Sequence, residues 1–350
     1  MITIARYISR LMLVRVLAVA LVLTALLQIM DLIDSVNDVL DRRDSIADLV
    51  IYAGYRLPSI FEGTIPIAVL LGTIAVFLAL AGRSELDAMR SGGLSQGRLV
   101  LLCLPMVLLF AGLHFVLVDR VVPASQQAFT EWWDGPVNTG DVLWLRGANS
   151  IVSIGDTSHN GRRLTDLSIY YRDSTGQLIA QIDADRATYD GTDWRLAGVE
   201  EQIFNGGTTD VSLHDTLPWP DGPQPETIGM LQRPPERLSA DLMTGLLSET
   251  WSGTTETASY RTELANRYAA PLASLVMLLL ASPAMRRQGR SSAALIGGLI
   301  GLALGLTFVV AGGILTALGR AGLVAPHLAA WLPVLAFAAM GLFLLRRTET

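Results

Sequence analysis

A short charged segment between two apolar regions, RSELDAMRSGG at 83–93, contains the side chains best suited to binding a partner protein. Ser84 and Asp87 have the spacing of a capping box and two glycines follow, so the pattern predicts a helix over 85–91. Its apolar residues are three apart and share one side, and its charges can pair with a partner. A solvated connector helix is the alternative. The candidate docking residues are Arg83, Glu85, Leu86, Asp87, Met89 and Arg90.

Catalytic chemistry has little support in this chain, and we predict no catalytic residues, cofactor or metal site. All 26 basic residues are arginine, which excludes the lysine of an ATP-binding phosphate loop. The single cysteine, Cys103, lies in an apolar segment, as expected for a packed thiol. No HExxH or GxSxG motif occurs. The net charge of -6 gives no basic surface for nucleic acid, which we exclude as a partner.

Three polar residues lie in or beside apolar segments: Glu62, His114 and His327. Acids inside a membrane can mark ion paths. Glu62 is so near the end of its segment that a cap or an interfacial contact is the more ordinary explanation, and isolated histidines on apolar helices are usually packed.

The elements around these residues are those of a membrane protein. The chain has 350 residues, of which 51% are hydrophobic and only 17% charged, and its mean hydropathy is +0.43. A helix needs about 20 apolar residues to cross a bilayer. Six segments meet this need, three before and three after a polar insert. They are Leu11–Ile33, Gly63–Gly82, Leu99–Val118, Tyr268–Met285, Ser291–Gly319 and Ala321–Leu345.

The arginines predict the orientation of these spans. With the N-terminus in the cytoplasm, the short inner segments hold ten arginines and the short outer loops hold four. The positive-inside rule therefore places both termini in the cytoplasm and the insert outside. The inner set includes three arginines after the fourth span, namely Arg286, Arg287 and Arg290.

The insert has the pattern of an all-β domain, with short alternating segments separated by turn residues. A sandwich, a jelly roll and an open meander all fit this spacing. We divide the chain into spans one to three (1–122, with the short helix at 84–91), the β domain (123–262) and spans four to six (263–350).

Glycines recur every four residues in the fifth span and form a stripe along which another helix can approach closely. Ordinary internal packing and a subunit interface or moving gate remain equal alternatives. The residues are Gly297, Gly301 and Gly305.

Taken together, the spans, the insert and several motifs resemble the permease family that exports lipopolysaccharide, LptF/LptG or YjgP/YjgQ, over nearly the whole chain. The motifs are RLPSIFEGTIPIAVLLGT, RSELDAMRSGGLS, WLRGANSIVSI, ATYDGTDWRL and ELANRYAAPLASLVMLLLASPAM. The end of the first span, LLQIMDLIDSVND, is more similar to the G component than to the F component.

This resemblance implies a fold, a function and partners. The fold is an α-helical membrane protein with six transmembrane helices, three plus three, and an inserted periplasmic jelly-roll-like β domain. The function is that of a permease subunit of an ATP-driven exporter in the bacterial inner membrane. The implied partners are an ATPase dimer at the 84–91 helix, a second homologous permease, a periplasmic jelly-roll bridge protein and lipopolysaccharide.

The resemblance also implies where the lipid head group binds, near the outer end of the first span. Family members often have basic residues there, whereas this chain has Gln28, Asp31 and Asp34. Head-group recognition is either shifted to nearby arginines, whose guanidinium groups suit phosphate, or the lipid carries fewer anionic groups. The arginines are Arg42, Arg43 and Arg56. An ion-coupled secondary transporter and a membrane-anchored envelope scaffold are the competing functions.

Overall fold

The computed structural model describes residues 2–43, 45–134, 142–158, 161–205, 208–248, 250–253, 255–285 and 291–349. It divides into two compact units, Met1–Phe129 with Thr262–Thr350, and Thr130–Arg261. Each unit is described by itself below.

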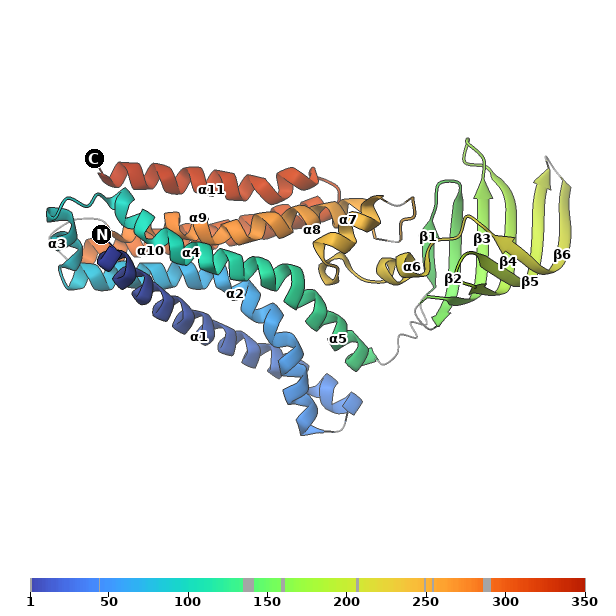
Figure 1. Ribbon diagram of the computed structural model, residues 1–350, viewed down its shortest axis with the longest axis horizontal. Helices are drawn as coiled ribbons and strands as arrows, with labels where there is room; N and C mark the ends of the chain where they lie inside the picture. The colour runs from blue at the N-terminus through green and yellow to red at the C-terminus, as the bar shows by residue number, and fades with distance from the viewer. Residues whose placement is uncertain are drawn as a thin grey trace. The chain divides into compact units, whose positions relative to one another are not determined.

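The first unit consists of long helices (Figure 1). The first half of the chain supplies α1 (Ile2–Arg43), α2 (Ile46–Gly82), α3 (Glu85–Ser91) and α4 (Gln96–Val116). A π-helical turn (Leu117–Val121) joins α4 to α5 (Val122–Asp134). The second half supplies α8 (Thr257–Ala269), α9 (Ala273–Leu280), the 3-10 turn Ser282–Met285, α10 (Ser291–Arg320) and α11 (Pro326–Glu349).

Six membrane spans are confirmed in the part of the chain that the structure describes. They are Thr3–Arg42, Ile46–Gly82, Gln96–Trp133, Thr257–Met285, Ala294–Arg320 and Pro326–Arg347. Several helices extend beyond the uncharged segments because a helix continues through polar residues once its apolar part is packed. The second is an example, since α2 passes through Pro58 and Pro66 and changes direction along its length in Figure 1.

The core of this unit lies between α2, α4 and the fourth span, which α9 continues. Phe77, Val107 and Met277 are among its fully buried side chains. Cys103 is also fully buried, so the thiol packs as an apolar side chain. The first span is much less packed than the fourth. In the most apolar 18-residue stretch of each span, 17% of the first span is buried and 72% of the fourth.

The second unit holds one antiparallel sheet of six strands in sequence order, β1-β2-β3-β4-β5-β6. This order is the open meander among the three arrangements that the sequence left open. The strands are β1 (Leu143–Arg146), β2 (Ser150–Ser158), β3 (Arg163–Arg172), β4 (Leu178–Tyr189), β5 (Trp194–Asn205) and β6 (Thr208–Trp219). Two helices follow the sheet, α6 (Pro225–Leu231) and α7 (Ala240–Ser248).

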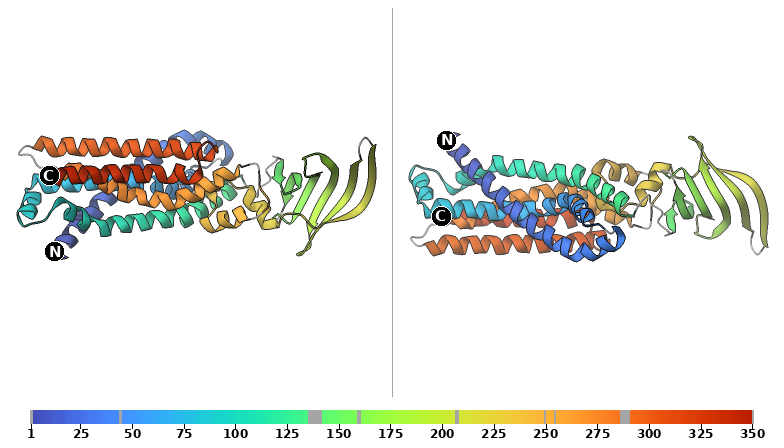
Figure 2. Two further views of the ribbon diagram at one scale, coloured as in Figure 1. Left: turned by 90° about the horizontal axis from the view of Figure 1, so that it is seen from above. Right: turned by 90° about the horizontal axis from the view of Figure 1, so that it is seen from below.

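A row of residues that crosses β2 to β6 interrupts the strand pairing. The pairs on either side are regular, but Gly155, Asp166, Asp185, Gly198 and Asp215 are not paired. Asp166 and Gly198 have positive φ angles of 56° and 65°, a left-handed conformation that breaks the pleat. The sheet is strongly curved in both views of Figure 2, as expected when a row of irregular residues crosses neighbouring strands.

Candidate functional site

The predicted short helix is present as α3, although its start differs from the capping-box expectation. Ser84 has φ 57° and its side chain makes no cap hydrogen bond. The physical reason is that Ser84 also ends the preceding helix, where its amide donates to the carbonyl of Ala81. A left-handed residue at this tight junction points its side chain away from the first turn of α3, so the capping-box prediction was wrong.

Several of the predicted docking residues of α3 contact the protein itself. Leu86 is 3% exposed and belongs to the apolar core, so the prediction that it faces a partner does not hold in this structure. The Oε2 atom of Glu85 accepts a hydrogen bond from Tyr7 Oη on α1 at 2.8 Å. Arg90 Nη2 donates to the carbonyl of Met285 at 2.6 Å. These contacts fix the orientation of α3 on the spans.

A groove of about 550 Å³ lies beside α3 and includes part of α1. Glu85 and Arg98 give it one charge of each sign, while most of its surface is apolar. A partner side chain of moderate size therefore has an apolar place to insert and charged groups to pair with. Its lining residues are Ile4, Glu85, Ala88, Met89, Gly92, Gly93, Leu94 and Arg98.

The other predicted docking residues lie outside this groove. Asp87 is exposed. Arg83 is also exposed, and its Nη1 atom is 3.9 Å from Glu85 Oε1. Of the six predicted docking residues, Glu85 and Met89 therefore line the groove.

A continuous stripe of α1 faces α2 and changes character along its length. Ile8, Met12, Val16 and Ala20 are buried and apolar, at the four-residue spacing of one helix face. The same face continues with polar residues that contact α2, and we call this part the polar seam. It consists of Thr24, Gln28, Asp31 and Ser35 from α1, with Tyr52, Arg56 and Thr64 from α2.

Three side-chain contacts cross the polar seam. Thr24 Oγ1 and Thr64 Oγ1 are 3.1 Å apart. Arg56 donates to both carboxylate oxygens of Asp31, with Nη2 to Oδ1 at 2.7 Å and Nε to Oδ2 at 3.3 Å. A third contact joins the hydroxyls of Ser35 and Tyr52 at 2.7 Å.

Gln28 lies between these contacts, and its amide is buried without a hydrogen-bond partner among the described residues. A buried amide of this kind is costly unless a polar group reaches it. The seam therefore has unused hydrogen-bonding capacity at the depth of Gln28.

The structure brings together only some of the predicted head-group residues. Gln28, Asp31 and Arg56 share the polar seam, whereas Asp34 and Arg42 are exposed and outside it. The side chain of Arg43 lies outside the described residues, as do Arg286, Arg287 and Arg290. The ion pair places the guanidinium group of Arg56 against an acid of the same protein. An anionic ligand at this position would have to compete with Asp31 or bind to the remaining donors of Arg56.

The glycine stripe of α10 contacts other spans of the same chain. A side chain at Gly297 would collide with the carbonyl of Pro283, and a Cβ at Gly301 would lie 2.5 Å from the carbonyl oxygen of Leu280. Gly305 faces Leu70 of α2 and Met277 of α9. Of the two alternatives from the sequence, these contacts are those of internal packing, with α10 in backbone contact with the end of the fourth span.

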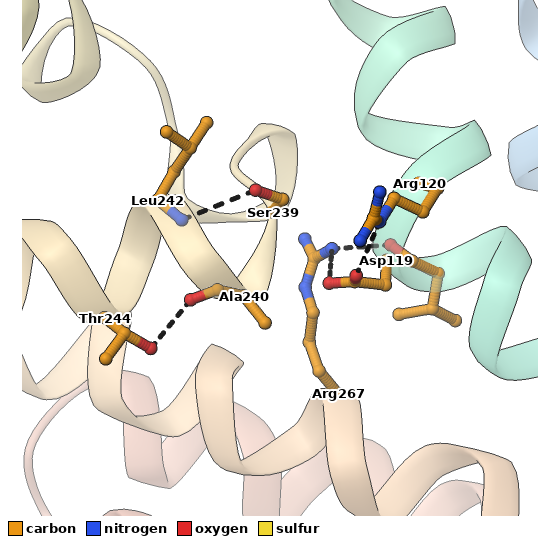
Figure 3. Close-up of polar contacts among 8 residues, drawn as sticks. Asp119, Arg120, Ser239, Ala240, Leu242, Thr244 and Arg267 are labelled. Carbon is orange, nitrogen blue, oxygen red and sulfur yellow. Dashed lines mark hydrogen bonds and ion pairs between the residues drawn. The ribbon is translucent and has the colours of Figure 1, made fainter.

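Charged residues inside the helical unit form pairs that no sequence motif indicates. Arg267 of α8 is 1% exposed in its side chain, donates to the carbonyl of Val118 at 2.5 Å and is 3.9 Å from the carboxylate of Asp119 (Figure 3). Both acceptors lie in the π-helical turn, whose altered geometry turns them toward the fourth span. A basic residue next to an apolar span was the available signal, since such a residue is costly without a partner.

Two further, partly buried pairs lie at other points of this unit. Arg320 Nη2 is 2.7 Å from Glu263 Oε2. His114, whose side chain is 3% exposed, places Nε2 2.8 Å from Glu62 Oε1. Glu62 lies in the interior of α2 and so does not cap it, whereas its interpretation as an interfacial contact stays a prediction.

These features define the class of the protein: a multi-pass membrane protein with a β domain inserted between its third and fourth spans. The chain belongs to the family described as lipopolysaccharide export system permease LptF/LptG, whose model matches residues 6–347. The prediction of family membership is confirmed. The chain is 24% identical over 245 residues to the lipopolysaccharide export system permease protein LptG of Haemophilus influenzae, and the match covers 68% of each chain. It is also 24% identical over 305 residues to LptG of Escherichia coli K12, covering 85% of this chain and 84% of that one.

Proposed function

We propose that this chain is a permease subunit of an ATP-driven exporter that extracts lipopolysaccharide from the bacterial inner membrane and passes it to a periplasmic bridge of β-jelly-roll proteins. The observation that carries the proposal is the family match over residues 6–347, together with six spans and an inserted sheet. A second, homologous permease would complete the membrane part of the exporter. Both termini would be cytoplasmic and the β domain periplasmic, as the arginine distribution predicts.

ATP hydrolysis would take place on a separate partner, a dimeric ATPase at the cytoplasmic face. The absence of lysine supports this division, because a phosphate loop needs that residue. The groove beside α3 would receive the ATPase, with Met89 and Ala88 as apolar contacts and Glu85 as a charged one. Exposed Asp87 and Arg83 would meet it from outside the groove.

The polar seam would bind part of the lipid head group. Arg56 is the best placed of the predicted arginines, because it lies in the seam beside the unused amide of Gln28. Phosphate is a strong acceptor for guanidinium groups and can replace a carboxylate as a partner. Asp31 would then keep Arg56 in place between transport cycles.

Co-purification from native membranes tests this proposal, with mass spectrometry of the proteins and lipids that accompany the chain. An Ala88→Arg variant fills the groove, and a Ser91→Arg variant adds the same side chain to α3 outside the groove lining. We expect an ATPase and lipopolysaccharide with the wild type and with Ser91→Arg, and loss of the ATPase with Ala88→Arg. Recovery of the wild-type chain with neither ATPase nor glycolipid would contradict the proposal.

A second candidate, an ion-coupled secondary transporter, rests on the partly buried pair of His114 and Glu62. Ionisable residues inside a membrane can mark ion or proton paths. Transport into vesicles that responds to a pH gradient in the absence of ATPase, and that is lost in Glu62→Gln, would favour this function over the first.

A further inference from the structure

Two side-chain hydrogen bonds connect the short helix α3 to different parts of the helical unit, in addition to the packing of Leu86 in the core. Tyr7 connects it to α1 through the 2.8 Å hydrogen bond to Glu85. Arg90 connects it to the end of the fourth span through the 2.6 Å hydrogen bond to the carbonyl of Met285. The two contacts come from opposite ends of a seven-residue helix, so a rotation or displacement of α3 changes both.

The contact through Tyr7 reaches the least packed span. Only 17% of the most apolar 18-residue stretch of the first span is buried, the smallest share among the six described spans, and the buried face of α1 lies mainly against α2. Ile4, one turn before Tyr7, lines the groove beside α3. The N-terminal part of α1 therefore contacts the same short helix that we propose as the ATPase contact.

The contact through Arg90 reaches α10 through one intervening segment. Met285 ends the 3-10 turn Ser282–Met285, whose residues are all buried. Pro283 in this turn contacts Gly297, and Leu280 just before it contacts Gly301, both by their carbonyl groups. Packed backbone of this kind moves as a unit rather than deforming. The fifth span is also loosely packed, since 33% of its most apolar 18-residue stretch is buried.

We propose that Tyr7 and Arg90 are positioning residues that transmit the movement of α3 along two separate routes, Tyr7 to α1 and Arg90 to α10. The proposal rests on the proposed function, in which nucleotide binding by a partner moves α3. Neither residue contacts nucleotide.

Distance measurements between spin labels test the two routes independently. Because Cys103 is the only cysteine, a Cys103→Ala chain provides the background for labels. One pair reports on α1 against α2, at exposed Ile33 and Val50, and a second pair reports on α10 against α8, at exposed Ile314 and Tyr268. The intact complex with its ATPase is measured without nucleotide and after trapping with ATP and vanadate.

In the otherwise wild-type background, we expect nucleotide to shift both distances. Tyr7→Phe, which removes one oxygen atom, should abolish the α1 shift and leave the α10 shift. Arg90→Gln should do the reverse, and Arg90→Lys, which keeps a charged donor, should restore part of the α10 shift. A residue with a merely structural role would alter both distances together.

The outcomes separate the inference from the proposed function. The inference is overturned if each variant abolishes both shifts or neither, or if the chain binds its ATPase but shows no shift before substitution. If no ATPase accompanies the chain, the proposed function fails first. A Glu85→Gln variant provides a further check, because it weakens the same hydrogen bond and should match Tyr7→Phe in the α1 distance.

Discussion

Asp31 and Arg56 form a two-bond ion pair inside the polar seam, and each side chain satisfies the other at a partly buried position. Their side chains are 19% and 32% exposed. Removing one partner leaves the other with an unmet charge, which costs more than the pair itself contributes.

We expect Arg56→Gln to lower the unfolding free energy of the detergent-solubilised protein by about 1–3 kcal/mol, the cost of a charged group that loses its hydrogen-bond partner. Thermal unfolding followed by tryptophan fluorescence measures the change. The control exchanges the two residues, Asp31→Arg with Arg56→Asp, and should recover much of the loss. Equal melting temperatures for Arg56→Gln and the wild type would show that the ion pair does not stabilise the seam.

Asp190, in the turn between β4 and β5, has a pKa lowered to about 2 by backbone hydrogen bonds from Asp193 and Thr192. An unfolded aspartate has a pKa of about 3.9, so the folded state prefers the ionised form. The resulting stability is present above pH 4 and is lost as pH falls through the folded pKa.

In Asp190→Asn this contribution is absent at every pH. We expect the melting temperature of the wild type to exceed that of the variant at pH 6, and the gap to narrow progressively as pH falls from about 4 toward 2. Melting curves of both proteins across this range make the comparison. A gap that stays constant with pH would contradict the assignment.

At the scale of elements, the glycine spacing in α10 identified a real contact surface but not its partner. Gly297 and Gly301 face the end of the fourth span, while Gly312 has no atom within 4 Å of an added Cβ. Gly297→Ala should therefore destabilise the helical unit by about 1–3 kcal/mol through overpacking, whereas Gly312→Ala in the same helix should be neutral or slightly stabilising. Thermal unfolding of the two variants provides the measurement, and similar melting temperatures would argue against the backbone contact.

The sequence predicted elements better than contacts. Six apolar segments were identifiable because a bilayer sets a minimum length, and the two glycines after Ser91 predicted the end of α3. The predicted cap at Ser84 does not form because the backbone of Ser84 is already used to end α2. Arg267 and the π-helical turn were missed as well, since no local pattern indicates a π-turn and its function depends on a residue from another span.

For the molecule as a whole, the two edges of the sheet are unequal. β1 is four residues long and Arg146 in it pairs with Ser252, whereas β6 has twelve residues and a mostly exposed surface. Among the described strands β6 pairs only with β5, and a long strand at the edge of a sheet is a site for strand addition. The sequence predicted an all-β domain but left its topology open, because strand order depends on pairing between segments rather than on alternation within each one.

If the periplasmic bridge protein joins this domain by strand addition, it should join at β6. A photoreactive amino acid at Leu213 should then crosslink to the bridge protein in intact cells, and one at Trp144 in β1 should not. Crosslinking at Trp144 alone would assign the junction to the opposite edge.

The polar seam also has a consequence for the biogenesis of the protein. An unpaired aspartate or arginine costs about 2.5–3.5 kcal/mol at the centre of a span and less near the end of a span, where Asp31 lies. Asp31 is synthesised before Arg56, and few residues separate α1 from α2. The cost of placing Asp31 in the membrane is therefore offset only when Arg56 emerges from the ribosome. We therefore expect the first two spans to leave the translocon more readily as a helical hairpin whose two charges are already joined.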